Sequence, residues 1–210
     1  MPFFSTTFSE SLTPAESSNS RDSYINPSNI GKTLPNPLRL AILSEAPLEG
    51  YEIWFEKADG KRISRVAAGD FPSPALLAEY EALVPGKVAK KVDFDTKQPT
   101  DKDAISRCTA FFVYDYEAES VKVLSCDKIS LLKEIERKTA DPDYSDLTKW
   151  DLQINKITAP KVSYSADMKP SIRQRDPAVS AKITAAWDDA LAAGANIMRL
   201  TDGGNPFSSK

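Results

Sequence analysis

The sequence contains no histidine, and this absence excludes several classes of protein at once. Histidine is the most frequent general base in enzymes and a common ligand of zinc, copper and iron. A Ser-His-Asp triad is therefore excluded. With only two cysteines, a structural zinc site of the usual kind cannot be built either. We predict no metal and no cofactor.

The motifs of phosphate-binding and hydrolytic enzymes are also missing. The pair Gly203-Gly204 has no strand before it and no helix after it, so it is not a phosphate loop. No G-x-S-x-G motif is present. The acidic residues within 141–146 (DPDYSD) lack the glycine and the distal glutamate of a calcium loop, which favours a solvated turn. We predict that the chain is not an enzyme, with a carboxylate–metal nuclease as one alternative.

No apolar run approaches the ~18 residues that a membrane span needs. The first residues, MPFFSTTFSES, lack the basic start and apolar stretch of a secretory signal, so we expect a cytoplasmic protein without membrane contact. Cys108 and Cys126 flank a predicted hairpin. A disulfide between them is geometrically feasible, but two small semi-buried thiols are favoured.

The hydropathy pattern divides the chain into an arm, a β-rich domain and a tail. Residues 1–37 are polar and rich in turn formers, which predicts a flexible N-terminal arm. Residues 38–170 are predicted to form one domain, and residues 171–210 a C-terminal helix with a flexible tail. The expected fold class is mainly β with a few helices (α+β), built as a small antiparallel barrel of the OB type.

Short β-rich and amphipathic stretches support this division. Strands are predicted at residues 38–43, 51–57 and 61–67, and hairpins at 106–126 and 149–167. Helices are predicted at 75–84, 127–139 (with Asp127 as N-cap) and 177–195. Residues 85–103 are polar and charged, which predicts a mobile or irregular connection.

Aromatic and basic residues alternate along several of the predicted strands. Single-strand binders need both types, because cations follow the phosphate backbone while rings stack on unpaired bases. Net charge is only −3, and an average of this kind says nothing about a local groove. The candidate DNA-binding residues are Tyr51, Trp54, Lys61, Arg62, Arg65, Arg107, Phe111, Phe112, Tyr114, Tyr116, Lys122, Lys156 and Tyr164.

The alternation does not decide which of these rings contact DNA. In residues 109–116 both faces of the predicted strand carry aromatics, so one set is expected in the core and the other at least partly exposed. Aromatics on strands are usually core residues, and basic residues usually lie on solvated faces. Packing and binding therefore remain two readings of the same residues.

Several segments together resemble phage single-stranded DNA-binding proteins. AFFVYDYEAESVKVLSCDKISLLKEI (residues 110–135) is similar to an aromatic strand, turn, strand and helix of that family. The segments at 38–65 and 141–171, and LTDGGNPF at 200–207, also resemble family elements in the same order. The family often has Trp where Phe111 or Phe112 stands, and an arginine near Lys156.

This resemblance implies an OB-type protein that binds and protects single-stranded DNA, independently of sequence, in phage replication or recombination. Its compartment would be the host cytoplasm. The terminal segment with Asp202, Pro206 and Phe207 would recruit replication or recombination proteins or occupy the DNA groove. Self-association is left open. The alternatives are a protein- or RNA-binding OB module, or a virion assembly protein without a DNA-coating role.

Overall fold

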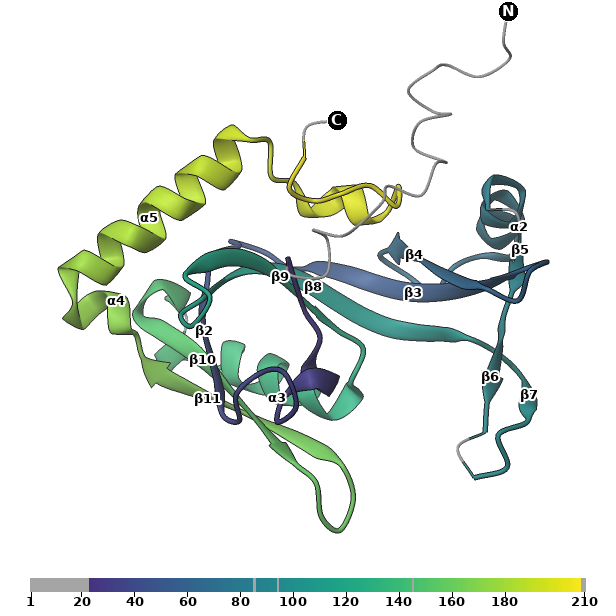
Figure 1. Cartoon of the computed structure of the whole chain (residues 1–210), viewed down its shortest axis with the longest axis horizontal. Helices are drawn as coiled ribbons and strands as arrows, with labels where there is room; N and C mark the ends of the chain where they lie inside the picture. Colours follow the sequence, from purple (N-terminus) through teal and green to yellow (C-terminus); the bar gives the residue numbers. More distant parts are fainter. Residues whose placement is uncertain (1–22, 85, 94, 145, 209–210) are drawn as a thin grey trace, which may run out of the picture.

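A computed structural model describes residues 23–84, 86–93, 95–144 and 146–208. It has a mixed α+β fold in which most elements are strands (Figure 1). The strands are β1 (Tyr24–Ile25), β2 (Leu38–Ile42), β3 (Leu48–Lys57), β4 (Arg62–Ala68), β5 (Gly86–Val88), β6 (Lys90–Val92), β7 (Pro99–Asp103), β8 (Ile105–Asp115), β9 (Ser120–Cys126), β10 (Trp150–Ile157) and β11 (Ser163–Pro170).

Four α-helices lie within the described ranges. They are α2 (Pro74–Leu83), α3 (Ile129–Thr139), α4 (Ile172–Arg175) and α5 (Pro177–Ala192), with short 3-10 turns η1 (Pro27–Asn29), η2 (Pro142–Tyr144), η3 (Leu147–Lys149) and η4 (Ile197–Leu200). Each of these helices falls short of the length and hydrophobicity of a transmembrane span. The strands, hairpins and helices that the sequence predicts are present in the structure. Their boundaries differ from the predicted ones by a few residues.

The main sheet follows the strand order β1-β9-β8-β2-β10-β11, and β3 joins it through β8. Strand β8 is long enough to serve two partners, because its first half pairs with β3 and its end pairs with β2. Helix α3 connects β9 to β10. Among the described strands the path is open, since β11 and β1 are its two ends and do not pair.

Local signals explain where two of the helices begin. The Ser73 hydroxyl accepts a hydrogen bond from Leu76 N, and the Asp176 carboxylate accepts from Ala178 N and Val179 N. A proline follows each of these N-caps, where its missing N–H has no cost. The prediction of Asp127 as the N-cap of α3 is wrong. Lys128 holds that position, and the Asp127 carboxylate instead pairs with Lys128 Nζ at 2.7 Å.

The inner core fills the side of the sheet on which α3 packs. It includes Leu40, Phe111, Val113, Leu131 and Leu152, all buried. The segment that follows Ser23 also contributes, because the side chains of Ile25 and Ile30 are completely buried. This part of the predicted flexible arm is thus packed against the domain, whereas residues 1–22 lie outside the described residues.

The C-terminal segment (residues 176–208) covers the outer face of β8 and β9 (Figure 1). Phe112 meets the ring of Trp187 at 5.2 Å and that of Phe207 at 5.4 Å between centroids. Tyr114 packs with Ile183 of α5. The expectation that one aromatic set of residues 109–116 would be at least partly exposed is wrong for Phe112 and Tyr114, which the C-terminal segment buries, whereas Tyr116 is half-buried.

The stretch predicted to be a mobile or irregular connection contains three strands, β5, β6 and β7. Strand β5 adds to β3, with Phe55 opposite Val88. The Glu81 carboxylate of α2 accepts a hydrogen bond from Val88 N and holds this strand in place. Strands β6 and β7 form a separate ribbon that projects from the domain (Figure 1). Within this ribbon, Lys90 Nζ lies 2.7 Å from the Asp103 carboxylate.

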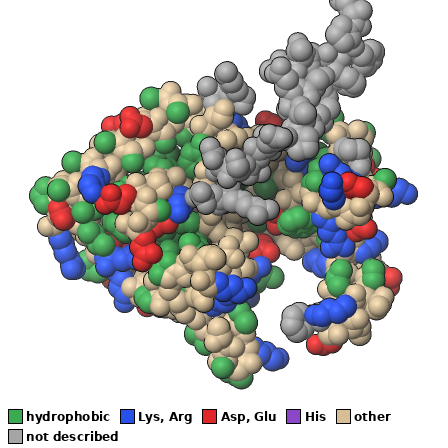
Figure 2. Space-filling model, in the orientation of Figure 1, with side chains coloured by type: hydrophobic (Ala, Val, Ile, Leu, Met, Phe, Trp, Pro, Cys, Tyr) green, Lys and Arg blue, Asp and Glu red, His purple; other side chains and the backbone are tan. Residues whose placement is uncertain are grey.

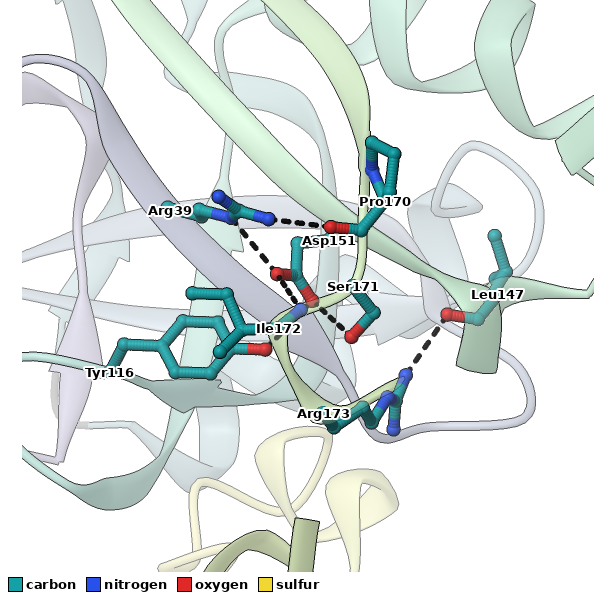
Figure 3. Close-up of polar contacts among 8 residues, drawn as sticks. All are labelled: Arg39, Tyr116, Leu147, Asp151, Pro170, Ser171, Ile172 and Arg173. Atoms are coloured by element: carbon teal, nitrogen blue, oxygen red, sulfur yellow. Dashed lines mark hydrogen bonds and ion pairs between the residues drawn. The ribbon is translucent and has the colours of Figure 1, made fainter. Parts of the chain in front are cut away.

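The carboxylate of Asp151 is completely buried and is the centre of a polar network (Figure 3). It pairs with Arg39 Nε at 2.9 Å and accepts hydrogen bonds from Tyr116 Oη, Ser171 Oγ and Ile172 N at 2.7–3.0 Å. A buried charge is tolerated only when it is paired and hydrogen-bonded. This network therefore fixes β10 to β2, to the end of β8 and to the start of α4.

The two cysteines are free, as the favoured reading of the sequence predicts, and they are buried rather than semi-buried. Thr109 is the cross-strand partner of Cys126, so Cys108 beside it faces the opposite side of the sheet. Burial raises the pKa of Cys108 to about 12 and that of Cys126 to about 11. Since the thiolate is the reactive form, both thiols are protected chemically as well as sterically.

Asp151→Asn should lower the free energy of unfolding by about 3 kcal/mol. The substitution removes the negative charge that pairs with Arg39 and accepts the surrounding hydrogen bonds, and it leaves those buried donors without their anion. Urea denaturation measures the loss. Asp167→Asn is the control, since that carboxylate is 45% exposed and lies 3.4 and 3.8 Å from its partners Lys138 and Lys169. It should cost about 0.5 kcal/mol or less. Equal losses in the two variants would contradict a special role for Asp151.

Iodoacetamide at pH 8 should modify neither cysteine of the folded protein at an appreciable rate. Each unit by which burial raises a pKa leaves roughly tenfold less thiolate at that pH. Mass spectrometry over time in buffer and in guanidinium chloride measures the difference, and both thiols should react once the chain unfolds. Rapid alkylation of Cys126 in buffer would show that the inner core is open to solvent.

Candidate nucleic-acid interface

The far end of β3 presents a polar face with one large aromatic ring. In the antiparallel register Trp54 is opposite Ser64, and Glu56 is opposite both Arg62 of β4 and Lys87 of β5. Cross-strand partners share a face of the sheet, so these five side chains project in the same direction. We call this surface, formed by Trp54, Glu56, Arg62, Ser64 and Lys87, the Trp54 face.

The Trp54 face is open because the opposite face of the same strands is covered. Ile53 and Phe55 are fully buried beneath α2 and meet Leu77 and Tyr80 of that helix. Alternation along β3 then directs Trp54 outward, where it remains 37% exposed. Among the candidate aromatics, Trp54 is the one whose side chain is exposed.

Cations surround the Trp54 face. A shallow hollow of about 620 Å³ beside it is lined by Lys57, Arg62, Lys87 and Lys90, with Glu56 as its only acidic residue. Figure 2 shows Lys and Arg side chains at the β3–β5 end of the molecule, with acidic side chains among them and further basic ones elsewhere in the view. Within the described part of the chain, neither Lys57 nor Lys87 has an ion-pair partner. The surface therefore carries positive charge that is free to meet an anion.

Two of these cations, Arg62 and Lys90, form ion pairs, and these pairs hold their side chains only weakly. Arg62 donates to the Glu56 carboxylate at 3.1 and 3.2 Å, but both side chains are at least 40% exposed. The Lys90–Asp103 pair is similarly exposed. Exposed pairs contribute about 0–1 kcal/mol, so a phosphate can compete with either carboxylate.

Glu52 lies next to Trp54 along the same face. Burial raises the pKa of its carboxyl above the ordinary glutamate value, and hydrogen bonds from the side chains of Ser64 and Trp54 oppose that rise. These bonds orient the indole by its N–H and leave the π-face of the ring available. The arrangement suits stacking on a planar group.

The remaining candidates of β3 and β4 point elsewhere. Tyr51 belongs to the side covered by α2 and makes an edge contact with Phe71, 5.2 Å between centroids. Arg65 is the cross-strand partner of buried Ile53 and packs at the edge of β4 against Gly203. Lys61 is exposed in the turn and pairs with Asp59 at 3.4 Å. The structure therefore assembles Trp54 and Arg62 and separates the other three.

The candidate residues on β8 and β9 and just after β8 pack or pair within the fold. Phe111, Phe112 and Tyr114 are each 5% exposed or less. Tyr116 donates its hydroxyl to Asp151, and Lys122 pairs with the buried Asp115 at 2.9 Å. None of these five presents a free ring or a free charge to solvent.

The last three candidates lie on the side of α3. Arg107 is exposed and lines a cavity between β8 and this helix. Lys156 Nζ donates to the carbonyls of Ser28 and Ile30, at 2.8 and 3.1 Å. Tyr164 is 8% exposed within the inner core. Lys156 and Tyr164 therefore hold the N-terminal segment and the core together.

Three cations of the interface were missed by sequence reasoning, namely Lys57, Lys87 and Lys90. Lys87 and Lys90 fall in the stretch that looked like an irregular connection. Their placement depends on β5 joining the free edge of β3, a pairing distant in sequence. The motif KVAKK at 87–91 is the only local signal, and it is too short to indicate a strand.

The predicted docking residues of the tail are themselves docked. Pro206 is buried and its carbonyl accepts a hydrogen bond from Asn196 N at 2.8 Å. Phe207 packs on Phe112. Gly203 has a φ of +71°, and a Cβ there would lie 2.5 Å from Arg65 Cζ, so glycine is required beside that guanidinium. Asp202 remains exposed.

Comparison of the chain with models of protein families, with curated proteins and with solved structures gives no match. Within the described ranges, no group of three or more cysteine and carboxylate side chains is placed to hold a metal ion. Chemically, the Trp54 face offers one stacking ring, the cations Arg62 and Lys87 and the carboxylates Glu52 and Glu56, and the hollow beside it adds Lys90. Such a surface can bind a flexible polyanion that carries planar groups.

Proposed function

We propose that the chain binds and protects single-stranded DNA, without preference for sequence, through the Trp54 face. One observation carries the proposal, namely the exposed indole of Trp54 on the same face as Arg62 and Lys87, next to a hollow that Lys90 also lines. A base stacked on an aromatic side chain contributes about 1–3 kcal/mol, whichever base it is. The lysines and the arginine meet the phosphates on either side. No covalent step is involved.

The preference for a single strand follows from the ring. Bases of a duplex are already stacked and paired, so the indole has no free π-face to meet. Cations alone would bind duplex and single strand alike through the phosphates. Trp54 is therefore the residue that discriminates, and the cations supply affinity that weakens as salt rises.

The connectivity of the sheet supports an OB-type arrangement. The path β9-β8-β2-β10-β11, with α3 between β9 and β10, agrees with a five-stranded, partly open Greek-key barrel. In this comparison β2 and β3 together are the first strand, and residues 58–104 are the connection from the first strand to the second. OB-folds bind oligonucleotides on the second and third strands and on this connection. The Trp54 face lies beside that connection.

The C-terminal segment covers the part of the outer face that belongs to β8 and β9. It thereby limits the open surface to the region around Trp54. Asp202 adds a negative charge beside Arg65, which the backbone of Gly203 also contacts. We infer that the segment competes with DNA for this face and that Asp202, Pro206 and Phe207 become available to partner proteins when DNA displaces them.

A role in phage replication or recombination, in the host cytoplasm, follows from the resemblance to phage single-stranded DNA-binding proteins. It is proposed on the order of the similar segments, together with the chemistry of the Trp54 face. If the chain were instead a protein- or RNA-binding module on the same fold, or a virion assembly protein, its ligands would be different.

Fluorescence anisotropy with labelled oligo-dT, a duplex and an RNA of the same length tests the proposal. Tight binding that prefers the single DNA strand is expected. Equal binding of RNA would favour an RNA-binding module. No binding to any of the three would overturn the proposal, and self-association without nucleic acid, seen by sedimentation, would then favour an assembly role.

Trp54→Ala should weaken oligo-dT binding about tenfold, because it removes one stacking platform. Phe71→Ala is the matched control, since Phe71 is 62% exposed but contacts Tyr51, away from the Trp54 face. Lys87→Ala should reduce the slope of log affinity against log salt by roughly 0.7, the contribution of one phosphate. Affinity that does not change with Trp54→Ala would rule out this surface.

Removal of residues 196–210 should raise the affinity for oligo-dT several-fold, because it uncovers Phe112 and frees Arg65 from Gly203. Helix α5 is retained, so Trp187 and Ile183 still cover part of the outer face. The same titration measures the change, with thermal unfolding to verify the fold. Unchanged affinity in a folded truncation would show that this segment does not compete with DNA.

A further inference from the structure

A cavity of about 330 Å³ lies between α3 and the β3–β8 pair, on the side of the sheet opposite the Trp54 face. Its position follows from the register. Tyr51 is the partner of Arg107, and Glu49 is the partner of Thr109, so these odd-numbered positions face away from Trp54. The cavity is thus a separate feature that strand binding by the Trp54 face does not use.

The cavity walls are apolar. Phe111, 5% exposed, lies on the sheet side. Leu132 and Ile135 of α3 face it. Ile129, at the start of the same helix, leaves 64% of its surface in solvent. The volume is at the lower end of the ~300–1,000 Å³ range of small-ligand sites, which suits one planar ring system.

Charged side chains of both signs line the cavity without partners. Glu49 and Arg107 come from neighbouring strands, and Lys133 and Glu136 come from α3. All four are exposed, and among the described residues none of their side chains makes an ion pair or hydrogen bond. An apolar slot with two free cations and two free carboxylates is complementary to a planar ligand that carries an anion and adjacent N–H donors.

We propose that this cavity binds a guanine nucleotide. The base would enter the slot between Ile129 and Leu132 on one side and the sheet on the other. The Glu49 carboxylate would accept the adjacent N1–H and N2–H donors of guanine, a bidentate arrangement that carboxylates favour. Arg107 and Lys133 would meet the phosphate.

The same chemistry selects against thymine. Thymine presents a single N–H between two carbonyl oxygens, and these oxygens repel a carboxylate. A carboxylate placed to accept two adjacent donors makes both hydrogen bonds with guanine and at most one with thymine, so guanine is preferred. The guanine can come from a free nucleotide or from an unpaired base of a strand, and both present the same edge.

Saturation-transfer NMR of the full chain with dGMP and with dTMP tests the proposal. A signal for dGMP at least tenfold stronger than for dTMP is expected, with a dissociation constant that rises more than tenfold in Glu49→Gln. Leu132→Trp should also abolish the dGMP signal by filling the slot. Glu117→Gln, an exposed carboxylate in the turn after β8 that belongs to neither surface, is the control and should bind dGMP as the unmodified protein does.

Equal signals for dGMP and dTMP, or a dGMP signal that survives both cavity substitutions, would overturn the proposal. Oligo-dT with and without one terminal guanine, titrated into the same samples, identifies the source of the base. A gain in affinity from that guanine, lost in Glu49→Gln, would assign the site to a strand end. Loss of oligo-dT binding altogether would contradict only the function of the Trp54 face, because the two sites lie on opposite faces.

Discussion

The buried carboxylate of Asp151 determines how the C-terminal third of the chain meets the sheet. An anion without water must be compensated by donors, and here Arg39, Tyr116, Ser171 and the backbone N–H of Ile172 supply them. These donors come from β2, from the end of β8 and from the chain after β11. The network therefore fixes the exit of β11 and the start of α4. Arg173, next in sequence, then donates to the carbonyls of Ile42 and Leu147.

The position of α4 places α5 across the outer face of β8 and β9. From there the chain passes beside Arg65 at Gly203 and then returns over Phe112 at Phe207. The inner side of the same strands is filled by α3 and by the segment with Ile25 and Ile30. Both sides of the central sheet are thus covered, and the open surface lies where β3 extends beyond these covers. This is the region of Trp54 and its surrounding cations, which is why we locate binding there.

Sequence reasoning could predict the strands and helices whose patterns are local. Alternation identified β2, β3, β4 and the two hairpins, and amphipathic spacing identified α2, α3 and α5. It could not predict which aromatics are buried, because the covers of Phe112 and Tyr114 come from residues 179–207. It also missed Lys87, whose strand β5 forms against the distant β3, and Lys90, which begins the next strand β6. Asp151 gave no signal, since a buried and a solvated aspartate look alike in a sequence.

The resemblance to phage single-stranded DNA-binding proteins remains a prediction, and the residues it singled out divide into two groups in the structure. Phe111, Phe112, Tyr114 and Tyr164 maintain the two cores, whereas Trp54 is available for a ligand. A family pattern can reflect packing as well as binding, because both restrict aromatic positions on strands. The exposed fraction of each ring separates the two causes.

Photo-crosslinking tests the location of the binding surface most directly. A single-stranded oligonucleotide with bromodeoxyuridine at each position would be irradiated with the full chain, and the cross-linked peptides would be identified by mass spectrometry. Cross-links at Trp54 and in the peptides of β4 and β5 are predicted. Cross-links confined to α3 or to the peptides around Lys156 and Tyr164, with none at Trp54, would contradict the assignment of DNA binding to the Trp54 face.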